Sequence, residues 1–138
     1  MALVVDTGVL YAAADTRDGD HDACSELLET HSPGELLVPA TVITESAWLI
    51  ADRLGDPAEQ AFIASIAAGE VTAEPLITSD WARIAELLAT YDDLHLGLVD
   101  ASVIGLAERL NIITIATLNH RDFRVVRPQH IEVFELVP

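Results

Sequence analysis

The chain has 138 residues, 51% of them hydrophobic, and a formal net charge of −16 from 23 acidic and 7 basic side chains. This length and apolar content predict a single folded domain over residues 1–138 and exclude a disordered chain. The longest stretch without a charged residue, 110–120, has 11 residues, well short of the ~20 that a membrane span needs, so no membrane association is expected. The single cysteine, Cys24, cannot form a disulfide within the chain, which favours the reducing cytoplasm.

All seven basic residues are arginines, and the chain contains no lysine. A P-loop needs a lysine on the phosphates and Schiff-base chemistry needs a lysine amine, so this absence excludes both. The acidic balance also argues against nonspecific binding of nucleic acid, which depends on Lys and Arg neutralising phosphates. It favours a basic protein partner, a bound cation, or solubility alone.

Apolar stretches alternate with amphipathic ones along the first half of the chain. In chain order the pattern predicts a strand at 2–6, a helix at 21–31, a strand at 35–39, and helices at 40–54 and 57–69. The two neighbouring helices are well bounded, because Gly55 and Gly69 follow their last turns and Pro57 opens the second.

The second half of the chain continues this alternation. It predicts an edge strand at 70–76, helices at 78–91 and 98–110, a strand at 111–117, and a last edge strand at 130–137. The run 111–117 is rich in β-branched residues, which is typical of a central strand buried on both faces. Strands alternating with helices predict an α/β fold with a parallel sheet covered on both sides, whose ligands bind beyond the carboxyl ends of the strands.

Two acidic residues, Asp6 and Glu45, stand at positions that fit either an ordinary structural role or a metal site. Asp6 directly follows the first apolar strand, where it caps the next turn with help from the hydroxyl of Thr7, or belongs to a metal site. Glu45 flanks the apolar stripe of its helix, beside Val42 and Leu49. A glutamate at such a border can pack its stem and keep its carboxylate in water, so Glu45 alone decides nothing.

Asp100 gives a stronger signal. It lies in the first turn of the helix 98–110, where the helix dipole favours an acid. The helical spacing places it on the apolar side, while Ser102, Glu108 and Arg109 mark the side expected to face water. An unpaired charge that faces inward costs several kcal/mol, so a function is favoured over the dipole alone.

Asp6, Glu45 and Asp100 can converge at one edge of a parallel sheet. Carboxylates that gather without cationic partners repel each other unless a divalent ion lies between them. Ligation by oxygen alone selects Mg²⁺ or Mn²⁺ rather than zinc. The three acids therefore predict a site for a hard divalent cation.

The segment after the strand 111–117 offers a fourth ligand and a basic rim. Asn119 and Asp122 both lie just past the strand end. Around them stand a histidine and three arginines at three-residue intervals: His120, Arg121, Arg124 and Arg127. These side chains either balance local acidic charge in a loop or hold a phosphodiester beside the cation site.

Four segments carry a family resemblance when they are taken together and in order. They are "LVVDTGVLYA", "VPATVITESAWLI", "LVDASVIGLAERL" and "IATLNHRDFRVVRP". They resemble the signature regions of PIN-domain ribonucleases, specifically the VapC toxins of type II toxin–antitoxin pairs. The resemblance runs from Leu3 to about Val137 and implies a single PIN domain, folded as a three-layer α/β/α sandwich with a central, mostly parallel sheet.

The resemblance also implies roles for particular residues. Asp6, Glu45 and Asp100 would be the acidic catalytic and metal-binding residues. Thr7 would support the first acid, and Thr117 would help to order the end of the last strand.

The fourth acidic position departs from the family pattern, because family members often carry Asp where this chain has Asn119. Either Asp122 substitutes as a catalytic acid, or Asn119 binds the metal through its carbonyl oxygen or through water. A neutral ligand would weaken binding of a second ion, so the use of one or two ions stays open. His120, Arg121 and Arg124 would contact RNA.

As a function, the resemblance implies Mg²⁺-dependent hydrolysis of phosphodiester bonds in structured RNA such as tRNA or rRNA, with Mn²⁺ as a substitute ion. It implies a homodimer and a VapB-like antitoxin with a basic segment, which suits the acidic surface. The alternative is a PIN-fold module of weak or no activity that works by binding a protein, a reading that Asn119 favours.

Overall fold

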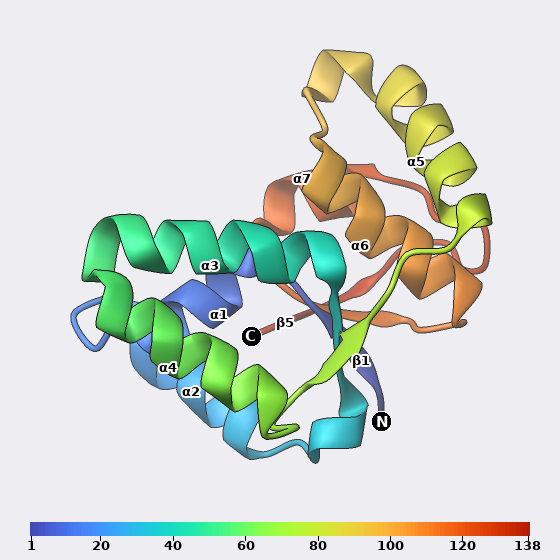
Figure 1. The fold of residues 1–138 in the computed structure, drawn as a ribbon. Helices are drawn as coiled ribbons and strands as arrows, with labels where there is room; N and C mark the ends of the chain where they lie inside the picture. Colours follow the sequence, from blue (N-terminus) through green and yellow to red (C-terminus); the bar gives the residue numbers. More distant parts are fainter.

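The computed structural model describes residues 1–138, which form one five-stranded sheet with helices on both sides (Figure 1). The strands are β1 (Leu3–Val5), β2 (Leu36–Pro39), β3 (Thr72–Glu74), β4 (Thr114–Ala116) and β5 (Glu135–Val137). Their order across the sheet is β3-β2-β1-β4-β5, and every neighbouring pair is parallel. All five strands therefore end along the same edge of the sheet. The predicted parallel sheet is confirmed.

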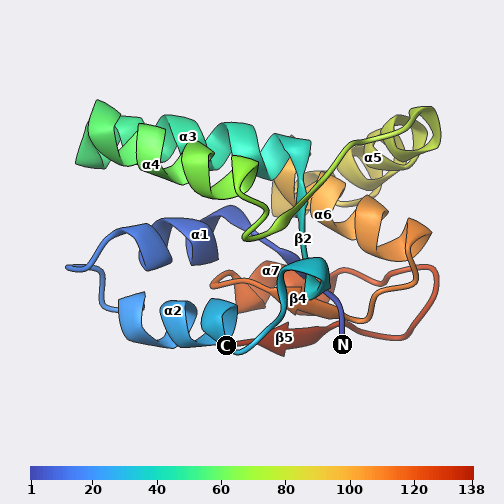
Figure 2. The same ribbon diagram turned by 60° about the horizontal axis from the view of Figure 1, so that its bottom comes forward.

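Seven helices surround the sheet: α1 (Thr7–Ala14), α2 (His21–Glu29), α3 (Ala40–Leu54), α4 (Asp56–Ala67), α5 (Thr78–Thr90), α6 (Leu98–Arg109) and α7 (His120–Val125). Two short 3₁₀ turns, η1 (Pro33–Glu35) and η2 (Asp92–Leu94), complete the chain. Helix α1 packs between α2 and α3, and α5 packs against α6 (Figure 2). The three-layer α/β/α sandwich is as predicted. No helix combines the length and the apolar character that crossing a bilayer requires.

The direction of chain progression reverses at the middle of the sheet. From β1 the chain moves outward to β2 and β3, and it then crosses to the other side of β1 to form β4 and β5. The carboxyl ends of β1 and β4 thus flank the point where the strand order reverses. In open α/β sheets this point is the usual position of a ligand site.

A single apolar core of 24 buried residues surrounds the inner strands, and all three residues of β1 belong to it. Helices α3 and α4 form a hairpin over this core with only Gly55 between them (Figure 1). Gly55 has a φ of 94°, which glycine adopts without the steric cost that a side chain would add.

Two helices were not predicted. Helix α1 shows no amphipathic periodicity from which it could be predicted, because it is apolar on nearly every side. Its buried residues include Val9, Leu10, Tyr11 and Ala12. Helix α7 was read as a loop. It is six residues long, and its signal is the capping residue Asn119 ahead of it.

Two strand predictions were wrong in detail. The run 111–117 forms an inner parallel strand that is buried on both faces, as predicted, but this strand, β4, is shorter than the run and covers only Thr114–Ala116. The last strand is confined to 135–137, where it pairs with β4, and does not begin at 130. Both edge positions, those of β3 and β5, agree with the prediction.

The expected water-facing side of the helix 98–110 was also wrong. Ser102 is fully buried, and the carboxylate of Glu108 pairs with Arg83 at 2.7 Å. Arg109 donates to the buried carboxylate of Asp80 at 2.9 Å. Helix α5 covers this side of α6 and supplies both partners, so polar residue types alone did not reveal which side faces water.

Candidate functional site

Asp6 lies at the carboxyl end of β1, where the strand passes directly into α1. The parallel register pairs Val5 with Ala116 of β4, and the N–H of Asp6 donates to the carbonyl of Ala116 at 2.9 Å. Asp6 is also the N-terminal capping residue of α1. Its place at the strand end is therefore fixed by both the sheet and the helix.

The carboxylate of Asp6 is buried, with 7% of the residue exposed, and both oxygens accept hydrogen bonds. Its Oδ1 accepts from the N–H of Thr7 at 2.8 Å, and its Oδ2 accepts from the hydroxyl of Thr117 at 2.9 Å. The hydroxyl of Thr117 in turn accepts from the N–H of Asn119 at 3.0 Å. The pKa of Asp6 is raised, because the effect of burial exceeds that of these hydrogen bonds and the charge of Glu45 adds to it.

Thr7 contributes differently from the prediction. Its backbone N–H holds Asp6, whereas its buried hydroxyl has no hydrogen-bond partner. Thr117, which lies directly after β4, uses its hydroxyl to connect the ends of the two strands that flank the reversal point.

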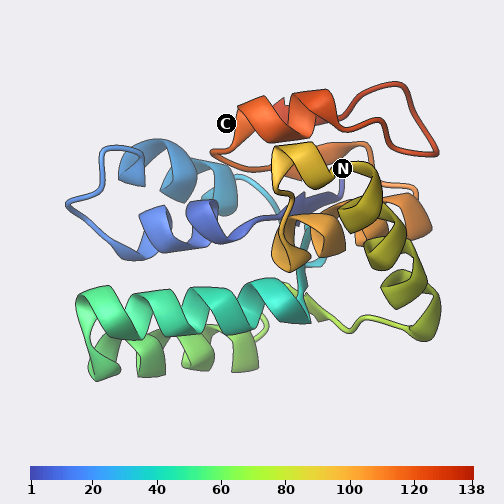
Figure 3. The same cartoon turned by 90° about the horizontal axis from the view of Figure 1, so that it is seen from above.

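Glu45 and Asp100 come from two helices that begin at this edge of the sheet (Figure 3). Helix α3 directly follows β2 and carries Glu45 in its second turn, while α6 carries Asp100 in its first. With Asp6 they line a cavity of about 440 Å³, which we call the carboxylate pocket; it is lined by Asp6, Thr7, Gly8, Glu45, Leu49, Asp100, Leu118 and Asn119. The three predicted acids therefore share one pocket.

Asp100 is, with Asp6, one of two acids of the pocket whose pKa is raised. It is half-buried, and its side chain makes no hydrogen bond or ion pair. The pKa of Asp100 is raised to about 7, first by burial and then by the negative charges of Asp6, Asp122 and Glu45 in that order. No arginine pairs with Asp6, Glu45 or Asp100, so their mutual repulsion is not relieved by the protein itself.

Asn119 and Asp122 are joined to each other. The amide of Asn119 donates to the carboxylate of Asp122 at 2.9 Å, and its carbonyl oxygen accepts from the Asp122 N–H at 3.4 Å as the cap of α7. Asn119 lines the carboxylate pocket, whereas Asp122 does not, although its charge acts on Asp100. Of the two candidates for the fourth position, Asn119 therefore lies at the pocket and Asp122 lies beside it, hydrogen-bonded to Asn119.

Three members of the predicted basic rim, His120, Arg121 and Arg124, lie on α7, whose capping residue Asn119 lines the pocket, and Arg127 follows the helix. The side chain of Arg121 is 88% exposed, with its guanidinium 3.8 Å from Asp122, and Arg124 is also exposed. His120 is half-buried, and its Nε2 donates to the carbonyl of Thr117 at 3.0 Å. The two arginines are free to meet a ligand, while one ring nitrogen of His120 is already occupied.

The donor chemistry of the carboxylate pocket fits a hard divalent cation. Its ligating atoms are carboxylate and amide oxygens, the set that Mg²⁺ and Mn²⁺ prefer. No three acidic, histidine or cysteine side chains are gathered closely enough to hold an ion as they stand. Like charges oppose such an approach in the absence of a cation, and the side chain of Glu45 is exposed rather than packed in the core.

Sequence reasoning missed the apolar walls of this pocket. Leu49 lies one helical turn after Glu45, so helical spacing could have indicated it. Leu118 directly follows Thr117 and is 38% exposed, and a Cβ added to Gly8 would lie 3.6 Å from its side chain. No pattern in the sequence distinguishes Leu118 from an ordinary loop residue.

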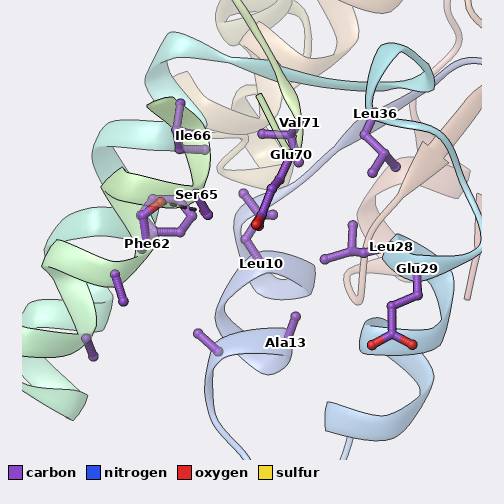
Figure 4. A pocket seen from close by; sticks show the side chains of 13 residues that line it. Leu10, Ala13, Leu28, Glu29, Leu36, Phe62, Ser65, Ile66, Glu70 and Val71 are labelled. Carbon is purple, nitrogen blue, oxygen red and sulfur yellow. Dashed lines mark hydrogen bonds between the residues drawn. The ribbon is translucent and has the colours of Figure 1, made fainter. Parts of the chain in front are cut away.

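A second cavity lies away from the acids, between α1, α2, α4 and the strands (Figure 4). It has a volume of about 430 Å³, and 10 of its 13 lining residues are hydrophobic, among them Leu10, Leu28 and Phe62. Its charged lining residues are Glu29 and Glu70. We call this cavity the apolar groove; it contains none of the predicted site residues.

Comparisons with known proteins agree with this fold. The sequence model of the PIN domain matches residues 3–127. The chain is 32% identical over 136 residues to Ribonuclease VapC26 of Mycobacterium tuberculosis (strain ATCC 25618 / H37Rv), covering 99% of this chain and 100% of the relative. The chain therefore belongs to the PIN-domain family, and within it to the VapC ribonuclease toxins of toxin–antitoxin systems.

Solved structures show the same fold at lower identity. The structure of Mycobacterium tuberculosis VapC20, described as a sarcin–ricin loop cleaving toxin, matches with a TM-score of 0.76 at 22% identity, over 83% of this chain and 87% of that one. The structure of VapBC2 from Rickettsia felis, bound to a DNA fragment from its promoter, matches with a TM-score of 0.70 at 15% identity, over 100% of both chains.

The raised pKa of Asp100 predicts a stability that depends on pH. Because the folded pKa of about 7 exceeds the ordinary value of 3.8, ionisation of Asp100 favours the unfolded chain; this loss of stability of the metal-free fold is absent below about pH 4, grows up to about pH 7 and is constant above it. In EDTA at pH 8, Asp100→Asn should stabilise the protein by about 1–2 kcal/mol, a range that allows for the solvent reaching the half-buried group. At pH 4.5 the gain should be much smaller. Urea unfolding at the two pH values measures both.

The exposed Asp93→Asn variant is the control for this experiment and should change stability little at either pH. An effect of Asp100→Asn that is the same at both pH values would show that ionisation of this carboxyl does not strain the fold.

Proposed function

We propose that this protein is a divalent-metal-dependent endoribonuclease that hydrolyses phosphodiester bonds in structured RNA, such as tRNA or rRNA, and that a VapB-like antitoxin neutralises it. The observation that carries the proposal is the carboxylate pocket. Asp6, Glu45 and Asp100, distant along the chain, line one cavity at the reversal point of the sheet without a cationic partner. Such a cluster is tolerated at neutral pH when a divalent cation neutralises it.

In this proposal, Asp6, Glu45 and Asp100 would hold Mg²⁺, or Mn²⁺ as a substitute, with the fourth position filled by Asn119 or Asp122. When bound, the ion would supply an activated water for attack on the phosphorus and would neutralise charge on the leaving oxygen. The chain's own contribution is orientation: two hydrogen bonds fix the carboxylate of Asp6. Asp100 is half-buried on a largely buried helix, and Glu45 is exposed, so Glu45 has the most freedom to adjust.

The arginines of α7 would position the substrate. Arg121 and Arg124 are exposed beside the pocket, and a guanidinium donates paired hydrogen bonds to phosphate oxygens. The remainder of the surface is strongly acidic, which would restrict binding to RNA whose shape brings a phosphodiester to this rim. An RNA substrate of this kind places the activity in the cytoplasm.

The antitoxin would meet this acidic surface with a basic segment. The apolar groove offers a site for the apolar side chains of the same segment, because Glu29 and Glu70 on its lining attract basic residues beside them (Figure 4). Electrostatic complementarity of this kind favours a basic amphipathic partner over an acidic one.

We also infer that residues 1–138 act as one PIN domain that forms a homodimer. One face, which we call the tryptophan face, exposes Trp48, Trp81 and Leu98 by 66%, 50% and 43% around a hollow of about 730 Å³. Its only charged lining residue is Glu45, so a second copy can bury it with little like-charge repulsion although each chain carries −16. Exposed aromatic patches of this kind mark interaction surfaces.

A second candidate function is a PIN-fold module that binds a partner and cleaves weakly or not at all. Asn119 favours it, because its neutral amide stands where family members often carry an acid and is already engaged with Asp122. The two functions differ in one measurable property, namely cleavage of RNA that depends on a divalent ion.

The nuclease proposal predicts that a fluorogenic structured RNA is cleaved in Mg²⁺ and not in EDTA. Asp100→Asn should lower the rate by about 100-fold or more, since it removes several kcal/mol of charge stabilisation. Asp93→Asn, which changes the same charge on an exposed turn, should leave the rate within a factor of two or so. Cleavage that persists in EDTA would contradict the metal mechanism, and absence of cleavage on all structured RNAs would favour the binding module.

The dimer proposal predicts that wild-type protein sediments at about twice the 14.9 kDa of one chain. Trp48→Glu and Trp81→Glu should each convert it to the monomer, because each places a new charge within the interface. Ile63→Glu, at a similarly exposed apolar position on α4, is the control and should stay dimeric. If the protein stays dimeric after both tryptophan substitutions, the dimer interface lies on another surface.

A further inference from the structure

Helices α3 and α6 are joined by one side-chain hydrogen bond, between the hydroxyls of Thr41 and Ser102 at 2.5 Å. Thr41 lies in the first turn of α3, four residues before Glu45. Ser102 lies at the start of the second turn of α6, two residues after Asp100. The bond therefore connects the two helices close in sequence to the acids that they carry.

The direction of this hydrogen bond follows from its neighbours. The hydroxyl of Ser102 also lies 2.6 Å from the carbonyl of Val99, which can only accept. Since a serine hydroxyl has one hydrogen, Ser102 donates it to Val99 and accepts from Thr41. Ser102 is fully buried, so neither contact exchanges with water. The chain Thr41–Ser102–Val99 thus ties the start of α3 to the backbone of α6.

The same two helices carry charges that repel each other. Glu45 on α3 and Asp100 on α6 line the carboxylate pocket, and the charge of Glu45 acts on Asp100. No ion pair connects α3 to α6, and no other hydrogen bond does. The hydroxyl pair is therefore the polar contact that opposes separation of the two helices at the pocket.

We propose that Thr41 and Ser102 are positioning residues, which hold α3 and α6 at the separation that lets Glu45 and Asp100 bind one divalent ion. This inference rests on the proposed function. In this proposal the pair does not bind the ion or the substrate itself. Its loss should let α3 and α6 shift, which would weaken metal binding while the fold persists.

The test is Mn²⁺ binding to the full chain, measured by calorimetry without RNA. Thr41→Val and Ser102→Ala should each raise the Kd for Mn²⁺ by about three- to tenfold, below the 10- to 100-fold typical of groups that hydrogen-bond a metal ligand directly. The double variant should bind Mn²⁺ no more weakly than the single variant with the higher Kd, because either change removes the same hydrogen bond. Thr41→Ser, which keeps the hydroxyl, should bind like wild type.

Thr44→Val is the matched control. It removes a hydroxyl from the same helix, but that hydroxyl donates only to Ala40 of α3 itself, so the Mn²⁺ affinity should not change. Thermal unfolding in EDTA and sedimentation establish that each variant is folded and in the same oligomeric state.

Mn²⁺ affinities of Thr41→Val and Ser102→Ala that equal wild type, even with lowered melting temperatures, would overturn the inference and leave the pair a purely structural contact. Wild-type protein that binds no Mn²⁺ would instead overturn the proposed function on which the inference rests. The two failures are distinguished by the wild-type titration alone.

Discussion

Electrostatic repulsion among carboxylates at one edge of the sheet is the constraint around which this structure is organised. Asp6, Glu45 and Asp100 line the same pocket, and Asp122 acts on it from the neighbouring helix. The raised pKa values of Asp6 and Asp100 express the free energy that their ionisation costs in the absence of a cation. A fold that keeps such a cluster gives up stability at neutral pH, which a bound cation would restore.

The local structure around each of the three acids is different. The parallel register brings the end of β1 beside the end of β4, so that Thr117 can donate to Asp6 across the reversal point. Asp100 gains from the dipole at the start of α6, and Ser102 links that helix to α3. Glu45 is exposed, and neither Glu45 nor Asp100 makes a side-chain hydrogen bond or ion pair. One acid is thus fixed by hydrogen bonds while the other two can adjust, which suits a site that closes around an ion.

Much of this arrangement followed from the sequence, because strand-end position and helical spacing are local properties. The parallel α/β/α fold and the meeting of Asp6, Glu45 and Asp100 needed only the alternation of elements and the rule that parallel strands end together. Helix α1 and the burial of Ser102 did not follow, because each depends on which neighbour covers a surface. The hydrogen bond between Asn119 and Asp122 was also not predicted, because residue types alone do not show whether two nearby side chains bind each other.

Anomalous diffraction from crystals soaked in Mn²⁺ tests the central claim most directly, because it locates the ion without depending on an RNA substrate. The account predicts an Mn²⁺ peak in the carboxylate pocket, in contact with Asp6 and Asp100, with the side chain of Glu45 turned toward it. A pocket that shows no peak at millimolar Mn²⁺, with the three carboxylates unchanged, would contradict it.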